Sequence, residues 1–106
     1  MHSYCTVFVT FPDSKVARET AVKLVEEKLC ACASVSEGHN SFFFWKNQAD
    51  SATEALMIVK TRTDRLEALD RRMRELHPYE VYEFIAMPII YGNANYLAWI
   101  DENTRQ

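Results

Sequence analysis

Three segments of this chain are apolar at consecutive positions: Phe42–Trp45, Ala55–Val59 and Phe84–Met87. Because successive side chains of a strand point to opposite faces of a sheet, each segment presents apolar side chains to both faces. The pattern of the chain predicts two long helices, which can cover one face of a sheet. The second apolar face therefore needs another cover, and this need limits the folds and assemblies open to the chain.

The predicted elements alternate between strands and helices. Tyr4–Thr10 is rich in β-branched and aromatic residues and is typical of a strand, and Asp13 or Ser14 can cap a helix that runs to about Lys28. The later elements are predicted as extended segments at 33–39 and 41–46, a polar turn at 47–52, a strand at 53–61, a helix capped by Asp64, a strand at 84–90 and a helix at 94–102. The order predicts an α+β, ferredoxin-like βαββαβ fold with a C-terminal helix, as a single domain over residues 1–106.

The surplus of apolar strand surface predicts an oligomer. Each large apolar side chain left in water forfeits about 1.5–3 kcal/mol of burial. Several such losses rival the roughly 5–15 kcal/mol that stabilises a whole domain, so an exposed patch of this kind marks an interface. In the alternative, the last helix and the loops fold across the open face. The expected interface residues are Phe42, Phe43, Phe44, Trp45, Met57, Tyr79 and Trp99.

Charge and hydropathy exclude several classes of protein. The net charge is −3, from 12 basic and 15 acidic side chains, so the chain lacks the basic stripe of a nucleic-acid binder. Phe42–Trp45 could stack bases as in an RNA-recognition fold, but the acidic charge and the missing motif argue against RNA. No apolar run has the length of a membrane span, and the N-terminus does not resemble a signal peptide. We expect a cytoplasmic protein that binds neither membrane nor nucleic acid.

The segment His77–Glu83 is the candidate functional site. Pro78 disfavours helical geometry at His77 and lacks a backbone N–H, so a helix must end here in a rigid corner. A neutral imidazole at His77 and a carboxylate at Glu83 could ligate Cu²⁺ or Zn²⁺, with further ligands from water or a neighbouring subunit. In the alternative, His77 terminates the helix and its polar atoms hold the corner together.

Other candidate sites are weaker. Cys30 and Cys32 could form a soft-metal or redox pair, or be two free thiols near a helix end. A catalytic function has little support, because the chain has two glycines, no phosphate-binding loop and no hydrolase or metalloprotease motif. Lys60, Arg62 and Arg65 could meet an anion near a strand end, or form a solvated basic face. We therefore expect a non-enzymatic protein.

Over nearly its whole length the chain resembles the CutA family of divalent-cation tolerance proteins. In order and spacing, the segments that carry the resemblance are Val7–Asp13, Leu24–Cys32, Trp45, Ile58–Thr61, His77–Glu83, Ile85–Pro88 and Gly92–Ile100. The resemblance implies a ferredoxin-like subunit in a tight trimer with sheets packed between subunits, similar in architecture to PII signalling proteins. It also implies a part in tolerance to copper and other divalent metals, without an attached enzymatic reaction. A PII-like small-molecule sensor and a protein-anchoring module, as in animal relatives, are the alternatives.

The chain departs from the family pattern at four positions. Tyr82 stands where proline is usual, Ser34 where asparagine is usual and Asn47 where glycine is common. Bacterial members carry a cysteine implicated in copper binding in the first strand, and Val9 occupies that position here. Cys5 lies four residues earlier and does not match it. Of the metal ligands that the resemblance implies, His77 and Glu83 remain, which weakens the copper interpretation.

Overall fold

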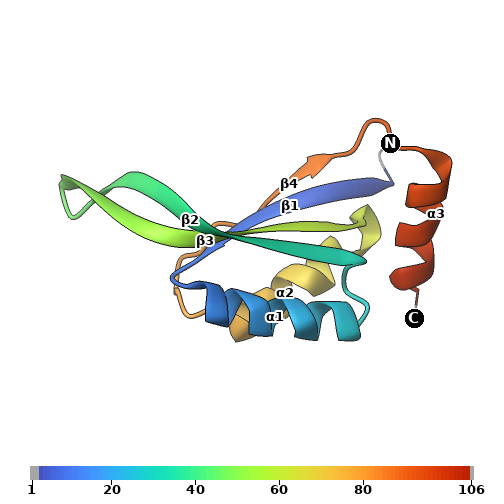
Figure 1. The fold of residues 1–106 in the computed structure, drawn as a ribbon, viewed down its shortest axis with the longest axis horizontal. Helices are drawn as coiled ribbons and strands as arrows, with labels where there is room; N and C mark the ends of the chain where they lie inside the picture. Colours follow the sequence, from blue (N-terminus) through green and yellow to red (C-terminus); the bar gives the residue numbers. More distant parts are fainter. Residues whose placement is uncertain (1–2, 106) are drawn as a thin grey trace.

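The computed structural model describes residues 3–105 and has an α+β fold. The elements are β1 (Tyr4–Phe11), α1 (Ser14–Glu26), β2 (Cys32–Trp45), β3 (Gln48–Arg62), the 3₁₀ helix η1 (Thr63–Arg65), α2 (Leu66–Leu76), β4 (Ile85–Pro88) and α3 (Ala94–Asn103). Their order confirms the predicted βαββαβ arrangement with a terminal helix (Figure 1).

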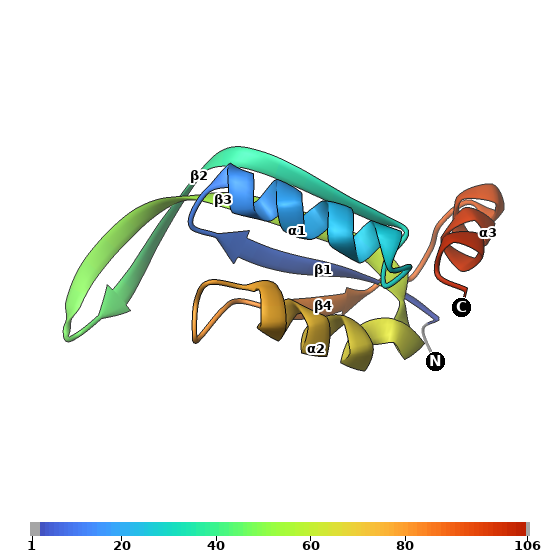
Figure 2. The same cartoon turned by 90° about the horizontal axis from the view of Figure 1, so that it is seen from below.

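The four strands form one antiparallel sheet in the order β2-β3-β1-β4. The register pairs Val7 with Val59 on one face and Phe8 with Ile58 on the other, so both faces carry apolar side chains. Helices α1 and α2 lie side by side across one of these faces (Figure 2). The core between helices and sheet contains the buried apolar residues Val7, Val9, Phe11, Ala17, Leu24, Met57, Val59, Leu69 and Met73.

The ends of the helices follow from local chemistry. The carboxylate of Asp13 accepts a hydrogen bond from the backbone N–H of Val16 at 2.9 Å, which satisfies one donor at the start of α1. The predicted Asp64 cap is wrong: α2 is preceded by η1 and has no side-chain cap, and Asp64 instead pairs with Arg62 at 3.1 Å. The helix α2 ends at Leu76 and His77 is its C-cap, as the following proline requires.

Strands β2 and β3 form a continuous hairpin that is longer than predicted. The polar segment 47–52 was expected to be a turn, but it belongs to β3 from Gln48 onward. The turn is two residues, Lys46 and Asn47, with φ of 50° and 65°, the left-handed geometry that matches the twist of a two-residue hairpin. Residues 39–54 extend beyond the end of β1, and we call this two-stranded extension the arm (Figure 1).

Met57 was predicted at the interface and is instead fully buried within its own chain, with 0% of its surface exposed. The prediction for Met57 was wrong because Ala55–Val59 does not place all of its apolar residues on the uncovered face. Ala55, Met57 and Val59 point into the core, whereas Leu56 and Ile58 point to the other side. The consecutive apolar pattern therefore identified a strand with two apolar faces, but not which residues lie on which face.

Helix α3 does not close the open face of the sheet. It stands at the end of the sheet beside the start of β1 (Figure 1), where Tyr4 donates a hydrogen bond to Asp101 at 2.7 Å. Ile100 anchors it and is fully buried. The alternative in which the last helix covers the second sheet face is therefore wrong.

Candidate functional site

His77 is the buried centre of the corner, with 8% of its surface exposed. Its Nδ1 accepts a hydrogen bond from the backbone N–H of Tyr79 at 3.0 Å. Its Nε2 lies 2.7 Å from the carbonyl oxygen of Thr10, which can only accept. The two partners therefore select the neutral tautomer with the proton on Nε2.

Aromatic rings enclose the imidazole on both faces. Phe11 stacks on one side, with ring centroids 4.4 Å apart, and Tyr82 stacks at 4.9 Å. The hydroxyl of Tyr82 donates to the carboxylate of Asp70 on α2 at 2.6 Å. Tyr82 thus joins the corner to α2 by stacking on His77 and by a hydrogen bond to Asp70.

Burial lowers the pKa of His77 below its ordinary value, because the charged form would lose its hydration. The Thr10 carbonyl and the negative charge of Glu54 act in the opposite direction and are weaker. The neutral ring demanded by the hydrogen bonds is therefore also the form that burial favours.

Tyr79 joins the corner to the arm. Its hydroxyl donates to the carboxylate of Glu54 at 2.9 Å. Burial, followed by this hydrogen bond to a negative charge, raises the pKa of Tyr79 to about 12. The Tyr79 hydroxyl therefore stays protonated at neutral pH, so it remains a donor to Glu54.

The geometry gives His77 a structural part and leaves the predicted metal pair incomplete. A metal would have to displace either the Tyr79 N–H from Nδ1 or the Thr10 carbonyl from Nε2, because both nitrogens have partners. Glu83, the residue that follows Tyr82, is exposed to solvent. Among residues 3–105, no three His, Cys, Asp or Glu side chains gather closely enough to hold a metal ion.

The members of each of the other candidate clusters differ in their environments. Cys30 is fully buried, and burial raises the pKa of its thiol to about 12, which makes it unreactive. Arg62 forms an ion pair with Asp64. Arg65 is buried, and its guanidinium lies 3.5 Å from the carbonyl oxygen of Lys28, two residues after the end of α1. Lys60 and Arg62 are half-buried on β3 and thus differ from Arg65 in environment.

The second face of the sheet is an uncovered apolar surface. The register places Phe8 between Ile58 and Ile85 on this face, and Thr6 opposite Met87. Ile85 is 51% exposed and Met87 41%. We call this surface, made of Phe8, Leu56, Ile58, Ile85 and Met87, the open face.

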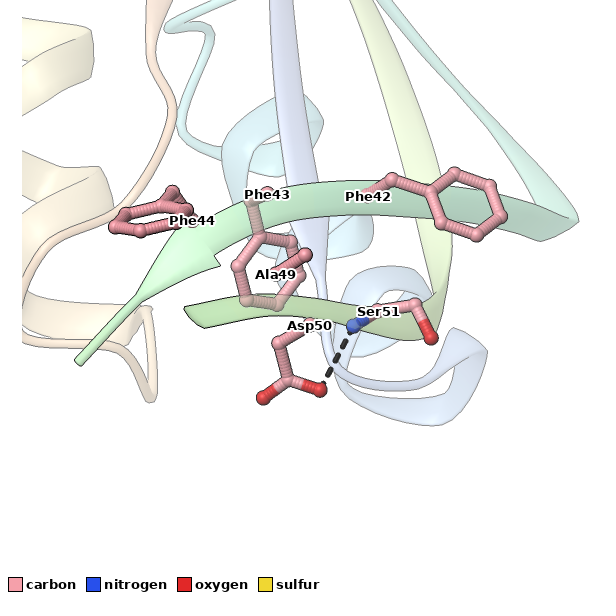
Figure 3. A pocket seen from close by; sticks show the side chains of 6 residues that line it. All are labelled: Phe42, Phe43, Phe44, Ala49, Asp50 and Ser51. Atoms are coloured by element: carbon pink, nitrogen blue, oxygen red, sulfur yellow. Dashed lines mark hydrogen bonds between the residues drawn. The ribbon is translucent and has the colours of Figure 1, made fainter. Parts of the chain in front are cut away.

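The arm carries the predicted aromatic interface residues in solvent. Phe42 is 80% exposed, Phe44 72% and Trp45 56%. Phe43 lies beside Asp50 of the facing strand, in an open hollow that Ala49 and Ser51 also line (Figure 3). Of the two remaining predicted interface residues, Trp99 on α3 is 40% exposed and packs on Tyr96, whereas Tyr79 is half-buried in its own subunit.

Sequence reasoning did not single out Phe8, Leu56 and Ile58 as surface residues, or Glu54 as the partner of Tyr79. Assigning alternate residues of each strand to opposite faces of the sheet would have identified the open face. The Glu54 contact joins segments 25 residues apart and has no local sequence signal.

These features define a ferredoxin-like chain with an open apolar sheet face and a projecting hairpin. The family model of the CutA1 divalent ion tolerance protein matches residues 5–103. The divalent-cation tolerance protein CutA of Thermus thermophilus is 43% identical over 98 residues, which are 92% of this chain and 95% of that protein. Protein CutA of Homo sapiens is 40% identical over 102 residues, 96% of this chain and 57% of that protein.

Solved structures agree in fold. The Cut A1 protein of Thermus thermophilus superposes with a TM-score of 0.93 at 41% identity, over 96% of this chain and 99% of that one. CutA1 of Oryza sativa superposes with a TM-score of 0.96 at 35% identity, over 99% of this chain and 96% of that one. The chain therefore belongs to the CutA family of divalent-ion tolerance proteins.

Proposed function

We propose that this chain is a non-catalytic, cytoplasmic subunit of a homotrimer that contributes to tolerance of divalent cations. Membership of the CutA family carries the proposal, because the family model covers residues 5–103 and is described by tolerance to divalent ions. Within the described residues, no helix is long and apolar enough to cross a membrane. The cation-tolerance part is tested by deleting the gene in its host and measuring growth against copper and zinc, with the wild-type gene restored as control.

The open face supports the assembly. Phe8, Leu56 and Ile58 lie on a sheet face without helices, and Ile85 and Met87 extend it at the edge strand β4. Burial of such side chains is worth about 1.5–3 kcal/mol each, so packing against other copies would stabilise the chain substantially. Sedimentation equilibrium at micromolar concentration should give roughly three times the 12.3 kDa subunit mass. A species of 12.3 kDa alone would contradict the trimer.

Direct metal binding at His77 and Glu83 stays a prediction, and the structure sets its condition. Cu²⁺ or Zn²⁺ would have to take one His77 nitrogen from its present partner, so binding would be weak and would loosen the corner. Calorimetry on wild type, His77→Ala and Glu83→Gln tests this, and identical isotherms for the three proteins would dismiss the site. His39→Ala is the matched control, since His39 lies on the arm.

The PII-like sensor is the second candidate, because an assembly through open sheet faces creates clefts between subunits. Lys60 and Arg62 alternate along β3 on the same side as Ile58, so they would lie near such a junction. A thermal-shift screen with metals, nucleotides and small anions separates the two functions. A selective shift with a nucleotide that is lost in Lys60→Ala would favour the sensor, and a shift with metals alone would favour cation tolerance.

A further inference from the structure

The open face borders on a row of polar side chains. The register places Lys60 of β3 between Cys32 of β2 and Thr6 of β1, two residues along the strands from Ile58 and Phe8. The side chains of this polar row, Cys32, Lys60 and Thr6, are half-buried and lie on the same face of the sheet as Ile58. An assembly that buries Ile58 and Phe8 therefore buries the polar row with them.

The next row along the same face has its polar groups satisfied within the chain. Arg62 lies opposite Tyr4 in the register. The Arg62 guanidinium pairs with Asp64 at 3.1 Å, and the Tyr4 hydroxyl donates to Asp101 at 2.7 Å. These two side chains need no partner from outside.

Lys60 and Thr6 differ from these neighbours. Among residues 3–105, the Lys60 ammonium group has no hydrogen bond or ion pair. The hydroxyl oxygen of Thr6, directly opposite Lys60, is buried and has no hydrogen-bond partner. An ammonium group removed from water without a counter-charge loses hydration that nothing replaces, and a hydroxyl group loses hydrogen bonds. Either a neighbouring copy supplies the partner, or the Lys60 stem lies along the face and its charged end reaches water.

The chain has carboxylates available for such a contact, because its 15 acidic side chains outnumber its 12 basic ones. Asp50 and Glu80 are exposed and have no basic partner among the described residues. Asp50 lies beside Phe43 on the arm (Figure 3), and Glu80 follows Tyr79. Phe43 and Tyr79 are expected interface residues, so the surface expected to meet another copy carries unpaired negative charge.

We propose that a carboxylate of a neighbouring copy binds the Lys60 ammonium group and completes a site that Lys60 and Thr6 leave open in the single chain. The site rests on the proposed homotrimer and deepens it. The Thr6 hydroxyl, in the same row, donates a second hydrogen bond to this carboxylate. Such a contact fixes the register of the copies, which the non-directional burial of apolar side chains does not do.

Substitution of Lys60 by methionine separates the two possibilities. Lys60→Met keeps the apolar stem but leaves the partner's carboxylate buried and unpaired, so the dissociation constant of the trimer should rise at least about tenfold. Lys60→Arg should restore most of the association, because it keeps the charge. Arg62→Met is the matched control on the same face, and the change should stay below about threefold because its charge is paired within the chain. Sedimentation velocity over a dilution series measures association, and circular dichroism checks the fold.

Chemical labelling tests the same contact in the wild-type protein. Acetic anhydride should modify Lys60 at least about ten times more slowly than the exposed Lys15 on α1, because the Lys60 amine is buried and bonded. In trimers mixed from isotope-labelled and unlabelled chains, a carbodiimide should join the Lys60 amine to a carboxyl group of another chain. The amide forms with loss of water, which the carbodiimide takes up as it becomes a urea, and mass spectrometry identifies the two residues.

The outcomes separate this contact from the assembly itself. A wild-type protein that sediments only as a monomer overturns the homotrimer and the Lys60 contact together. A stable trimer in which Lys60 reacts as fast as Lys15, or in which Lys60→Met associates as tightly as the parent, overturns the Lys60 contact alone. Equal weakening by Lys60→Met and Arg62→Met also overturns it, because the effect would then come from net charge.

Discussion

The backbone N–H of Tyr79 donates a hydrogen bond to Nδ1 of His77 at 3.0 Å, and Nε2 of the same ring donates to the carbonyl oxygen of Thr10 at 2.7 Å. One side chain thus fixes the chain direction after α2 and ties that corner to the end of β1. The sequence marks His77 as a ligand candidate because histidine is a common metal ligand. The structure shows that its two nitrogens serve the backbone.

Replacement of His77 by phenylalanine should destabilise the protein by about 2–4 kcal/mol. The ring would still stack on Phe11, but the Thr10 carbonyl and the Tyr79 N–H would lose their partner in a buried place, at about 1–3 kcal/mol each. Urea unfolding followed by circular dichroism measures the change. His39→Gln, on the arm, should change stability by less than about 0.5 kcal/mol, and an equal loss in both variants would contradict the structural part of His77.

Stability should fall as the pH is lowered from 7 towards 5. The folded-state pKa of His77 lies below its ordinary value of 6.5, so the unfolded chain binds the proton first. Stability therefore rises with pH between the folded and the unfolded pKa and is level above about 6.5. Unfolding curves of wild type and His77→Phe across this range test the effect, since the variant should lack this part of the slope. Parallel slopes would show that other groups cause it.

A charge on the open face should weaken the proposed assembly. Ile85 is 51% exposed on the side of the sheet opposite α1 and α2, and a carboxylate there would be desolvated on association. Ile85→Glu should raise the dissociation constant at least tenfold, or about 1.4 kcal/mol, as measured by sedimentation velocity over a dilution series. Val22→Glu on α1 is the control, because Val22 is 56% exposed on the helical side. Unchanged association of Ile85→Glu would place the interface elsewhere.

Gly38 lies in a β-bulge, where the register of β2 against β3 shifts between Ser36 and His39. Substitution of Gly38 separates backbone strain from packing. A Cβ atom at this position would have no heavy atom within 4 Å, so Gly38→Ala adds no clash and only strains the φ of 72°. The cost should be about 1–2 kcal/mol, and Gly38→Asn should cost less because asparagine tolerates the left-handed region. Thermal unfolding of the two variants gives the order. Equal stabilities would show that the bulge relaxes to another conformation.

Met57→Ala should cost about 2–5 kcal/mol of unfolding free energy, because the side chain is fully buried between sheet and helices. Chemical denaturation measures it. The dissociation constant of the assembly should not change in Met57→Ala, in contrast to Ile85→Glu. A change in association without a loss of subunit stability would return Met57 to the interface.

The amino-acid sequence by itself determined the order of the elements, the helix stop at His77–Pro78, and the existence of more apolar strand surface than two helices cover. These are local properties, set by side-chain periodicity and by the missing N–H and fixed φ of proline. The length of the hairpin was missed because the polar residues Gln48–Ser51 form strand in an arm whose sides both meet solvent, where alternation is absent.

Only the tertiary structure decided which apolar residues lie inside and what the polar corner does. Met57 and Ile58 are adjacent in sequence and equally apolar, but the register with β1 sends one into the core and the other to the open face. His77 and Thr10 are 67 residues apart, and Glu54 and Tyr79 are 25 apart. Contacts of this kind depend on where the strands and helices pack, and no short segment of the sequence carries that information.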